Sequence, residues 1–176
     1  MKLLSGAILF MKAIVCMNEI NGIGHFNGIP WHSRLDFSFF KKKTIGNGNN
    51  AIVMGRKTFE SLKCRPLTNR RNYVLTKNTA LSIMYGDGVV IESNPKNILL
   101  LDSIFDEVYI IGGAEIYRLF EPYISEIFVT RINNSLLCDT FFPIDLSKYH
   151  LEESEEAWEK NQMLIFSTFK KNTESV

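Results

Sequence analysis

Short apolar runs recur along the chain and predict the strands of a buried sheet. Each of the first five has Gly or Asn next to at least one end: Ala13–Met17, Ala51–Met54, Tyr73–Thr76, Val89–Ile91 and Val108–Ile111. Runs of this kind alternating with helical segments favour a mainly parallel sheet that is covered on both sides. Glu126–Ile132 and Met163–Lys170 predict later strands without a clear helix between them. The predicted fold is α/β: a single mixed, mainly parallel β-sheet flanked by helices on both faces, with an antiparallel C-terminal strand.

Polar residues at the starts of apolar-periodic segments mark the predicted helices. Ser33 precedes a segment in which Leu and Phe recur three and four residues apart, as on one helix surface. Asn94-Pro95 is typical of a cap followed by proline in the first turn. Residues 114–120 place three apolar side chains on one side, and Pro122 follows the end of that segment. Helices are therefore expected after Ser33, after Asn94 and over residues 114–120.

Composition narrows the class of protein. The 176 residues suit one domain, and a net charge of +1 with acids and bases interspersed provides no basic face for nucleic acid. No stretch approaches the ~20 apolar residues of a membrane span. Cys16, Cys64 and Cys138 lack the CxxC spacing of a zinc or redox site, which favours reduced thiols in a cytoplasmic protein and no metal site.

The first ten residues differ from the remainder. A lysine followed by a short apolar run resembles the start of a secretory signal, but Lys12 interrupts the run and no small-x-small cleavage site follows. We interpret residues 1–10 as an N-terminal extension, with Met11 a plausible alternative start. Residues 11–176 are expected to form the domain.

Two strand-to-helix junctions are candidates for phosphate binding. One is Gly55-Arg56-Lys57-Thr58 and the other is Gly112-Gly113-Ala114. A glycine at a helix N-terminus lets backbone N–H groups approach an anion, although tight turns also use glycine for steric reasons alone. Basic side chains beside the first junction, with Thr76 and Lys77 after the next strand, favour a phosphate site and suit NADPH better than NADH.

Asp36 is the most informative acid, and its surroundings allow two interpretations. Ser33-Arg34-Leu35-Asp36 matches a capping box, in which Asp36 would only accept a backbone N–H. The carboxylate is also flanked by phenylalanines, and aromatic walls with one charged anchor suit a flat, cationic heterocycle. Spacing alone leaves both interpretations open.

A series of motifs in order along the chain resembles the dihydrofolate reductase family. The motifs are IGHFNGIPW (23–31), VMGRKTFESL (53–62), RPL (65–67), RRNYVLT (70–76), IIGGAEIY (110–117), IFVTRI (127–132) and DTFFP (139–143). Together they cover nearly all of residues 11–170, and Asp36 falls where that family carries its single active-site acid. The chain departs from the common pattern at Thr68-Asn69, at Ser33-Arg34 and at Cys16, where alanine is common.

The resemblance implies roles for particular residues. The catalytic group would comprise Asp36, Trp31 and Thr130. The substrate would be bound by Ile14, Val15, Phe37, Phe40, Leu62, Arg70, Ile111 and Tyr117. The cofactor would be bound by Cys16, Ile23, Gly24, Gly55, Arg56, Lys57, Thr58, Thr76, Lys77, Ile111, Gly112, Gly113, Ala114, Glu115, Ile116 and Tyr117. A cis peptide is implied between Gly112 and Gly113.

The implied activity is NADPH-dependent reduction of 7,8-dihydrofolate to tetrahydrofolate, which supports one-carbon and thymidylate metabolism. Hydride would pass from the nicotinamide to the pterin imine carbon, and a proton would arrive through water with help from Asp36. Such a protein is expected to be monofunctional, monomeric and an antifolate target. An aminopyrimidine reductase of riboflavin synthesis should lack Pro-Trp, Asp36 and Arg70 in these roles. A non-catalytic protein that binds NADPH or folate remains an open alternative.

Overall fold

The computed structural model describes residues 10–81 and 88–172. Apart from Phe10, the predicted N-terminal extension lies outside the described residues, so the domain boundary at Met11 stays a prediction. The strands are β1 (Met11–Met17), β2 (Gly22–Gly24), β3 (Asn50–Gly55), β4 (Arg71–Leu75), β5 (Val89–Glu92), β6 (Glu107–Gly112), β7 (Ile124–Ile132), β8 (Thr140–Phe141), β9 (Tyr149–Glu159) and β10 (Gln162–Lys171). The helices are α1 (Arg34–Ile45), α2 (Arg56–Ser61), α4 (Pro95–Leu99) and α5 (Ala114–Phe120), with short 3₁₀ turns at Thr79–Leu81, Leu100–Ser103, Glu121–Tyr123 and Leu146–Lys148.

Eight strands form one mixed sheet in the order β5-β4-β3-β6-β1-β7-β10-β9. All neighbours from β5 to β7 pair in parallel, whereas β10 is antiparallel to both β7 and β9. The predicted fold class and the antiparallel C-terminal strand are confirmed. Each of the seven predicted strands is present, with ends that differ by a few residues.

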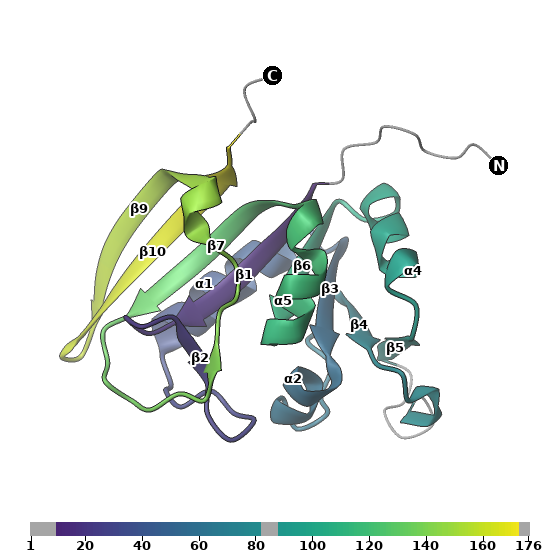
Figure 1. Cartoon of the computed structure of the whole chain (residues 1–176), viewed down its shortest axis with the longest axis horizontal. Helices are drawn as coiled ribbons and strands as arrows, with labels where there is room; N and C mark the ends of the chain where they lie inside the picture. The colour runs from purple at the N-terminus through teal and green to yellow at the C-terminus, as the bar shows by residue number, and fades with distance from the viewer. Residues whose placement is uncertain (1–9, 82–87, 173–176) are drawn as a thin grey trace.

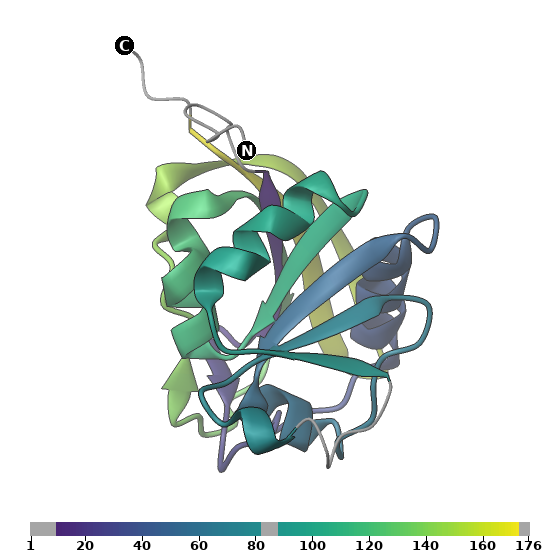
Figure 2. The same ribbon diagram turned by 90° about the vertical axis from the view of Figure 1, so that its right-hand side faces the viewer.

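Helices cover both faces of this sheet (Figures 1 and 2). The larger apolar cluster lies between the sheet and the side of α4 and α5, and includes Ile98, Ile116 and Phe120. The smaller cluster lies on the side of α1 and α2, with Phe39, Phe40 and Phe59 packed against the strands. Successive strand side chains point to opposite faces, so alternate residues of β1 belong to different clusters. No helix among the described residues is long and apolar enough to cross a membrane.

Two features were not predicted from the sequence. The first is β9, an edge strand that is exposed along most of its length and rich in glutamate. Its sequence lacks the apolar alternation that marks a half-buried strand, and charges of this kind are typical of protected sheet edges. The second is a separate two-stranded sheet formed by β2 and β8. These strands have only three and two residues, too few for a pattern to be visible.

The helix that carries Asp36 begins at the predicted cap. The backbone N–H of Asp36 donates a hydrogen bond of 3.1 Å to Oγ of Ser33, which is almost fully buried. The backbone N–H of Arg34 donates to both carboxylate oxygens of Glu159, each at 3.0 Å. A side chain from the distant β9 strand therefore completes the start of α1.

Replacing Ser33 by alanine should lower the free energy of unfolding by about 1 kcal/mol, because the first turn of α1 loses a side-chain acceptor. Urea denaturation of both proteins measures the change. Ser38→Ala is the matched control, since Ser38 is exposed within the same helix and alanine has the higher helix propensity. Equal effects of the two substitutions would contradict the assigned cap.

Candidate active site

The carboxyl ends of three neighbouring parallel strands, β3, β6 and β1, meet at one edge of the sheet, drawn at the bottom of Figure 1. The loop after β2 and the first turn of α1 complete this edge. Open α/β sheets bind ligands beyond the carboxyl ends of their strands. Most of the predicted catalytic, substrate and cofactor residues collect around this edge, on the two sides of the sheet, whereas Arg70 precedes β4 and lies toward the amino ends of the strands.

The Asp36 carboxylate enters this region instead of capping its own helix. Within residues 10–81 and 88–172 its side chain makes no hydrogen bond to backbone, so only the Ser33 half of the capping box forms. The carboxylate faces Cys16 and Thr130, which are register partners on β1 and β7. Burial raises the pKa of Asp36, and interactions with the Thr130 hydroxyl and the Cys16 thiol oppose that rise. The arrangement favours the anchor interpretation over the cap.

The Thr130 hydroxyl keeps unused hydrogen-bonding capacity. The residue is almost fully buried, and Oγ1 has no hydrogen bond of strict geometry among the described residues. It nevertheless lies close enough to Asp36 to lower the pKa of that carboxyl group. The hydroxyl can rotate toward either the carboxylate or a ligand. A buried hydroxyl in this state is suited to a polar ligand.

Trp31 and Tyr117 contact β1 from different sides. The indole Nε1–H of Trp31 donates a hydrogen bond of 3.2 Å to Sγ of Cys16. The Tyr117 hydroxyl, in the cluster on the other face, donates a bond of 2.7 Å to the carbonyl of Ile14. Burial raises the pKa of Tyr117, so the phenol stays protonated. Both bonds fix the carboxyl end of β1 beside Asp36.

Most of the predicted apolar wall is on the α1 side of the sheet. Ile14, Phe40, Leu62 and Ile111 belong to the cluster there. Phe37 stays 48% exposed beside the ring of His32, so its face is available to a ligand. Val15 differs from the expectation. Its side chain packs into the cluster on the opposite face, because neighbouring strand residues alternate.

Arg70 lies further along α1 from Asp36. Its Nη1 donates to Oγ1 of Thr44 at 2.7 Å, its Nε donates to the carbonyl of Thr68 at 3.0 Å, and its guanidinium lies 5.7 Å from the Phe40 ring centre. Burial lowers the pKa of Arg70. No carboxylate of the described residues forms an ion pair with it, which argues against an ordinary surface pair. Asn69 has φ +61°, a conformation that asparagine tolerates, so the unusual Thr68-Asn69 turn still directs Arg70 inward.

The two glycine junctions are adjacent, since β3 and β6 pair and Met54 is the register partner of Gly112. The peptide between Gly112 and Gly113 is cis, as the family resemblance implies. Gly112 has φ +106°, and an added Cβ would lie 2.9 Å from the Tyr117 ring. A Cβ at Gly55 would lie 3.0 Å from Cγ1 of Ile116. Close packing therefore explains both glycines structurally.

Cations and hydroxyls surround these junctions. Arg56 forms an ion pair of 2.7 Å with Glu60, one helical turn away. Lys57 and Lys77 are exposed, and Thr58 lies beside Gly113, whose added Cβ would be 3.5 Å from Oγ1. Oγ1 of Thr76 accepts from the Asn78 backbone. This donor set fits phosphate groups. The other predicted cofactor residues are Ile23 and Gly24 in β2, and Ala114, exposed Glu115 and Ile116 in the first turn of α5.

The loop between β2 and α1 is fastened at its tip. His25 and Gly28 exchange two backbone hydrogen bonds of 2.8 and 3.0 Å around a tight turn. The backbone N–H of Phe26 donates to Oδ2 of Asp139 at 2.8 Å, and the Asp139 N–H donates to the Gly24 carbonyl at 3.0 Å. Hydrogen bonds from the Phe26 backbone and the Thr140 hydroxyl lower the pKa of Asp139. The acid thus remains an acceptor for this loop.

Three residues around the site were missed. Thr44 follows Asp36 and Phe40 at four-residue intervals, so helical spacing from Asp36 could have found it. Phe39 packs against Phe128 and Phe166, and its place in the Phe-rich segment was the available signal. Glu159 comes from a hairpin far along the chain, and no sequence pattern links it to α1.

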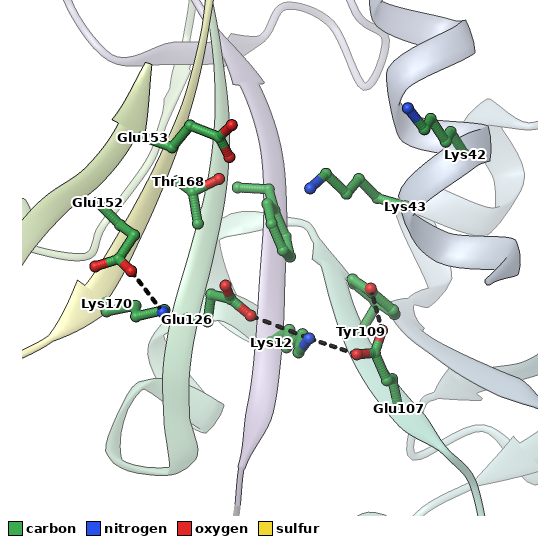
Figure 3. A pocket seen from close by; sticks show the side chains of 11 residues that line it. Lys12, Lys42, Lys43, Glu107, Tyr109, Glu126, Glu152, Glu153, Thr168 and Lys170 are labelled. Atoms are coloured by element: carbon green, nitrogen blue, oxygen red, sulfur yellow. Dashed lines mark hydrogen bonds and ion pairs between the residues drawn. The ribbon is translucent and has the colours of Figure 1, made fainter. Parts of the chain in front are cut away.

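A separate open cavity of about 460 Å³ lies on the α1 side of the sheet near the start of β1 (Figure 3). Lys12, at its floor, is four residues before Cys16, roughly 13 Å along the strand. Lys12 forms ion pairs with Glu107 and Glu126, and Lys170 forms one with Glu152. These charges largely neutralise one another, and the cavity lies away from the carboxyl ends of the strands.

Comparison with known proteins relates the chain to one family. The family model "Dihydrofolate reductase" matches residues 10–171. A dihydrofolate reductase of Bacillus subtilis is 38% identical over 144 residues, covering 81% of this chain and 82% of the relative. A dihydrofolate reductase of Haemophilus influenzae is 34% identical over 152 residues, covering 85% and 90%.

A solved structure is similar in fold as well as in sequence. It is a dihydrofolate reductase from Enterococcus faecalis in complex with NADP(H) and RAB-propyl. The two folds superpose with a TM-score of 0.84 at 31% identity, over 93% of this chain and 97% of the other.

Proposed function

The chain belongs to the dihydrofolate reductase family, an NADPH-dependent enzyme family, and we propose how its own residues carry out the reduction of dihydrofolate. The observation that carries the proposal is the partly buried Asp36 carboxylate, which faces Cys16 and Thr130 instead of its own helix backbone. Aromatic walls and one acid are what a cationic, flat heterocycle requires. The same residues argue against a protein that only binds NADPH.

In this proposal the substrate extends along α1. Asp36, supported by Thr130, holds the amino-pyrimidine edge of the pterin, and Phe37, Phe40 and Leu62 contact the rings. Arg70 binds the carboxylate of the glutamate tail. A planar guanidinium that Thr44 and Phe40 already orient loses little freedom when it forms two parallel bonds. The site therefore recognises both ends of one molecule.

The cofactor site combines both glycine junctions. Arg56, Lys57, Thr58, Thr76 and Lys77 would hold phosphate groups, and the segment from Gly112 to Tyr117 would hold the pyrophosphate and nicotinamide side. When bound, NADPH supplies the hydride that reduces the pterin imine carbon. The chain's basic and hydroxyl groups supply binding and orientation, and the loop ending at Trp31 excludes bulk water.

Protonation is the step in which Asp36 acts. The carboxylate contacts the edge of the ring away from the nitrogen that gains the proton, so water delivers that proton while Asp36 sets the tautomer and charge of the ring. Burial raises the pKa of Asp36 toward the working pH, which suits an acid-base group. We also propose that the protein acts as a monomer in the cytoplasm, in one-carbon metabolism. Free thiols at all three cysteines support that compartment.

Replacing Asp36 by asparagine should reduce turnover by about 10²–10⁴-fold, because the shape remains while the charge and the titration are lost. NADPH affinity should change little. Loss of cofactor absorbance measures turnover, and cofactor fluorescence measures binding. Activity close to that of the unaltered protein would remove Asp36 from the mechanism.

The same substitution should not lower stability at neutral pH. Because burial raises the pKa of Asp36, ionisation costs more free energy in the folded protein than in the unfolded chain. That cost is present above the raised pKa and disappears as the pH falls below about 3.9, the value of an unperturbed Asp. Asp36→Asn should therefore melt at the same or a higher temperature at pH 7.5, with any advantage lost near pH 4.

Replacing Arg70 by lysine should raise KM for dihydrofolate about 10-fold or more, the effect of ~1.4 kcal/mol, with a smaller change in kcat. Lysine keeps the charge but cannot form the two parallel bonds of a guanidinium. With a reduced pterin that lacks the glutamate tail, the substitution should change KM and kcat very little. Equal losses with both substrates would mean that Arg70 supports the fold or the cofactor instead.

NADPH should be preferred to NADH by roughly 10–1000-fold in kcat/KM, since each charge-assisted bond to the additional phosphate contributes ~1.5–3 kcal/mol. Arg56→Ala should remove most of that preference. The exposed pair with Glu60 is weak enough for a phosphate to displace. Glu60→Gln is therefore the control, and it should preserve or increase the preference.

A further inference from the structure

Cys16 lies between Trp31 and Asp36, two residues of the site for which the described part of the chain shows no direct contact with each other. Its sulfur accepts the hydrogen bond of 3.2 Å from Trp31 Nε1, the only hydrogen bond of that indole in the described part of the chain. No hydrogen bond joins its sulfur to Asp36 among the described residues, but the two groups lie close enough for each to affect the pKa of the other. The parallel register makes Cys16 the neighbour of Thr130, so both side chains reach the carboxylate from adjacent strands.

We propose that Cys16 is a positioning residue for the reduction reaction, whose thiol links the Trp31 indole to the Asp36 carboxylate by accepting from the first and donating to the second. Only the role of this thiol link in the reaction rests on the proposed function. The connection itself stands on the Trp31–Cys16 hydrogen bond and on the register that places Cys16 beside Thr130 at the carboxylate, and the bond from the thiol to Asp36 is the inferred part.

The thiol is suited to this double role. A cysteine carries one S–H donor and a sulfur that can accept, whereas alanine at the same place would leave the Trp31 N–H without its partner. Burial, followed by the charge of Asp36, raises the pKa of Cys16 well above its usual value. The group therefore remains a neutral thiol at working pH, and its proton is available to the carboxylate.

Other groups around Asp36 also raise or lower its pKa. Thr130 on β7 also lowers the pKa of Asp36, whereas the negative charge of Glu159 at the end of β9 raises it. Tyr117 on α5 stays neutral and interacts with both Cys16 and Asp36. Burial remains the largest influence, so each donor to the ionised carboxylate matters. Removing the thiol donor should make Asp36 harder to ionise.

The test is an NMR titration of Asp36 in protein labelled with ¹³C-aspartate, without substrate or cofactor. The Asp36 carboxyl signal is assigned by its absence in Asp36→Asn. We expect Cys16→Ala to raise the titration midpoint of Asp36 by about 0.5–1 pH unit, where one unit equals ~1.4 kcal/mol. Cys16→Ser retains a donor and an acceptor, so its midpoint should stay within about 0.3 unit of the unaltered protein or fall below it.

Two internal controls accompany this titration. Cys64→Ala removes an exposed thiol elsewhere and should leave the Asp36 midpoint unchanged. The Nε1–H signal of Trp31 should shift in Cys16→Ala, whereas that of Trp158, which is 65% exposed, should not. The proposal is overturned if Cys16→Ala and Cys64→Ala give the same Asp36 midpoint. It is also overturned if alanine and serine at position 16 move that midpoint equally, because the effect would then be one of packing.

A second measurement separates this inference from the proposed function. In single-turnover reactions with NADPH and dihydrofolate, the pH of half-maximal rate should move in Cys16→Ala by the same amount as the NMR midpoint. If the midpoint moves and the rate profile does not, the thiol link stands and the role of Asp36 in protonation is wrong. If neither moves, the thiol link itself is wrong.

Discussion

Burial of the Asp36 carboxylate is the interaction on which the layout of the site depends. An ionised group loses hydration when it enters an apolar region, and the site must offset that loss with well-placed donors. Cys16 and Thr130 place a thiol and a hydroxyl beside the carboxylate from the carboxyl ends of two adjacent strands, β1 and β7, and both lower its pKa. The position of the acid is in turn set by the start of α1, which Ser33 and Glu159 fix. Strand register and helix capping thus act on the same few atoms.

The parallel sheet explains why the other groups are within reach. Parallel strands end at a common edge, so the junction after β3 lies beside the junction after β6, and both lie near the end of β1. The missing side chain of Gly112, at a positive φ, leaves room for the ring of Tyr117, which donates a hydrogen bond to the Ile14 carbonyl of β1. Side-chain packing on the α5 face and the Asp36 site on the α1 face therefore both depend on the position of β1. A substitution in either cluster is expected to be felt at the site.

Strands that are buried on both faces were predictable, because each is a short continuous apolar run with Gly or Asn next to at least one end. That logic found β3 and β6 with only their ends misplaced, and it failed for β9, whose glutamates face solvent on the edge of the sheet. In the site, position along one element was readable: Asp36 was found after its cap, and helical spacing could also have found Thr44, which was missed. Contacts between distant elements were not. The bond from Trp31 to Cys16 depends on where a loop returns to β1, and the cap by Glu159 depends on a hairpin.

The rigidity of α1 links the two ends of the proposed substrate site. Asp36 and Thr44 are eight residues apart on one helix, which sets their separation along the axis at roughly 12 Å. Thr44 holds Arg70 through a bond of 2.7 Å, so the distance between the acid and the guanidinium follows from helix geometry rather than from a loop. The Thr68-Asn69 turn needs only to bring Arg70 close to Thr44, and the left-handed backbone conformation of Asn69 allows this. A ligand with a cationic ring at one end and a carboxylate at the other would meet both partners without rearrangement of α1. A shorter pterin would meet only the first, so in the proposed site selection for the tail would reside in Arg70 and its support by Thr44 rather than in the aromatic walls.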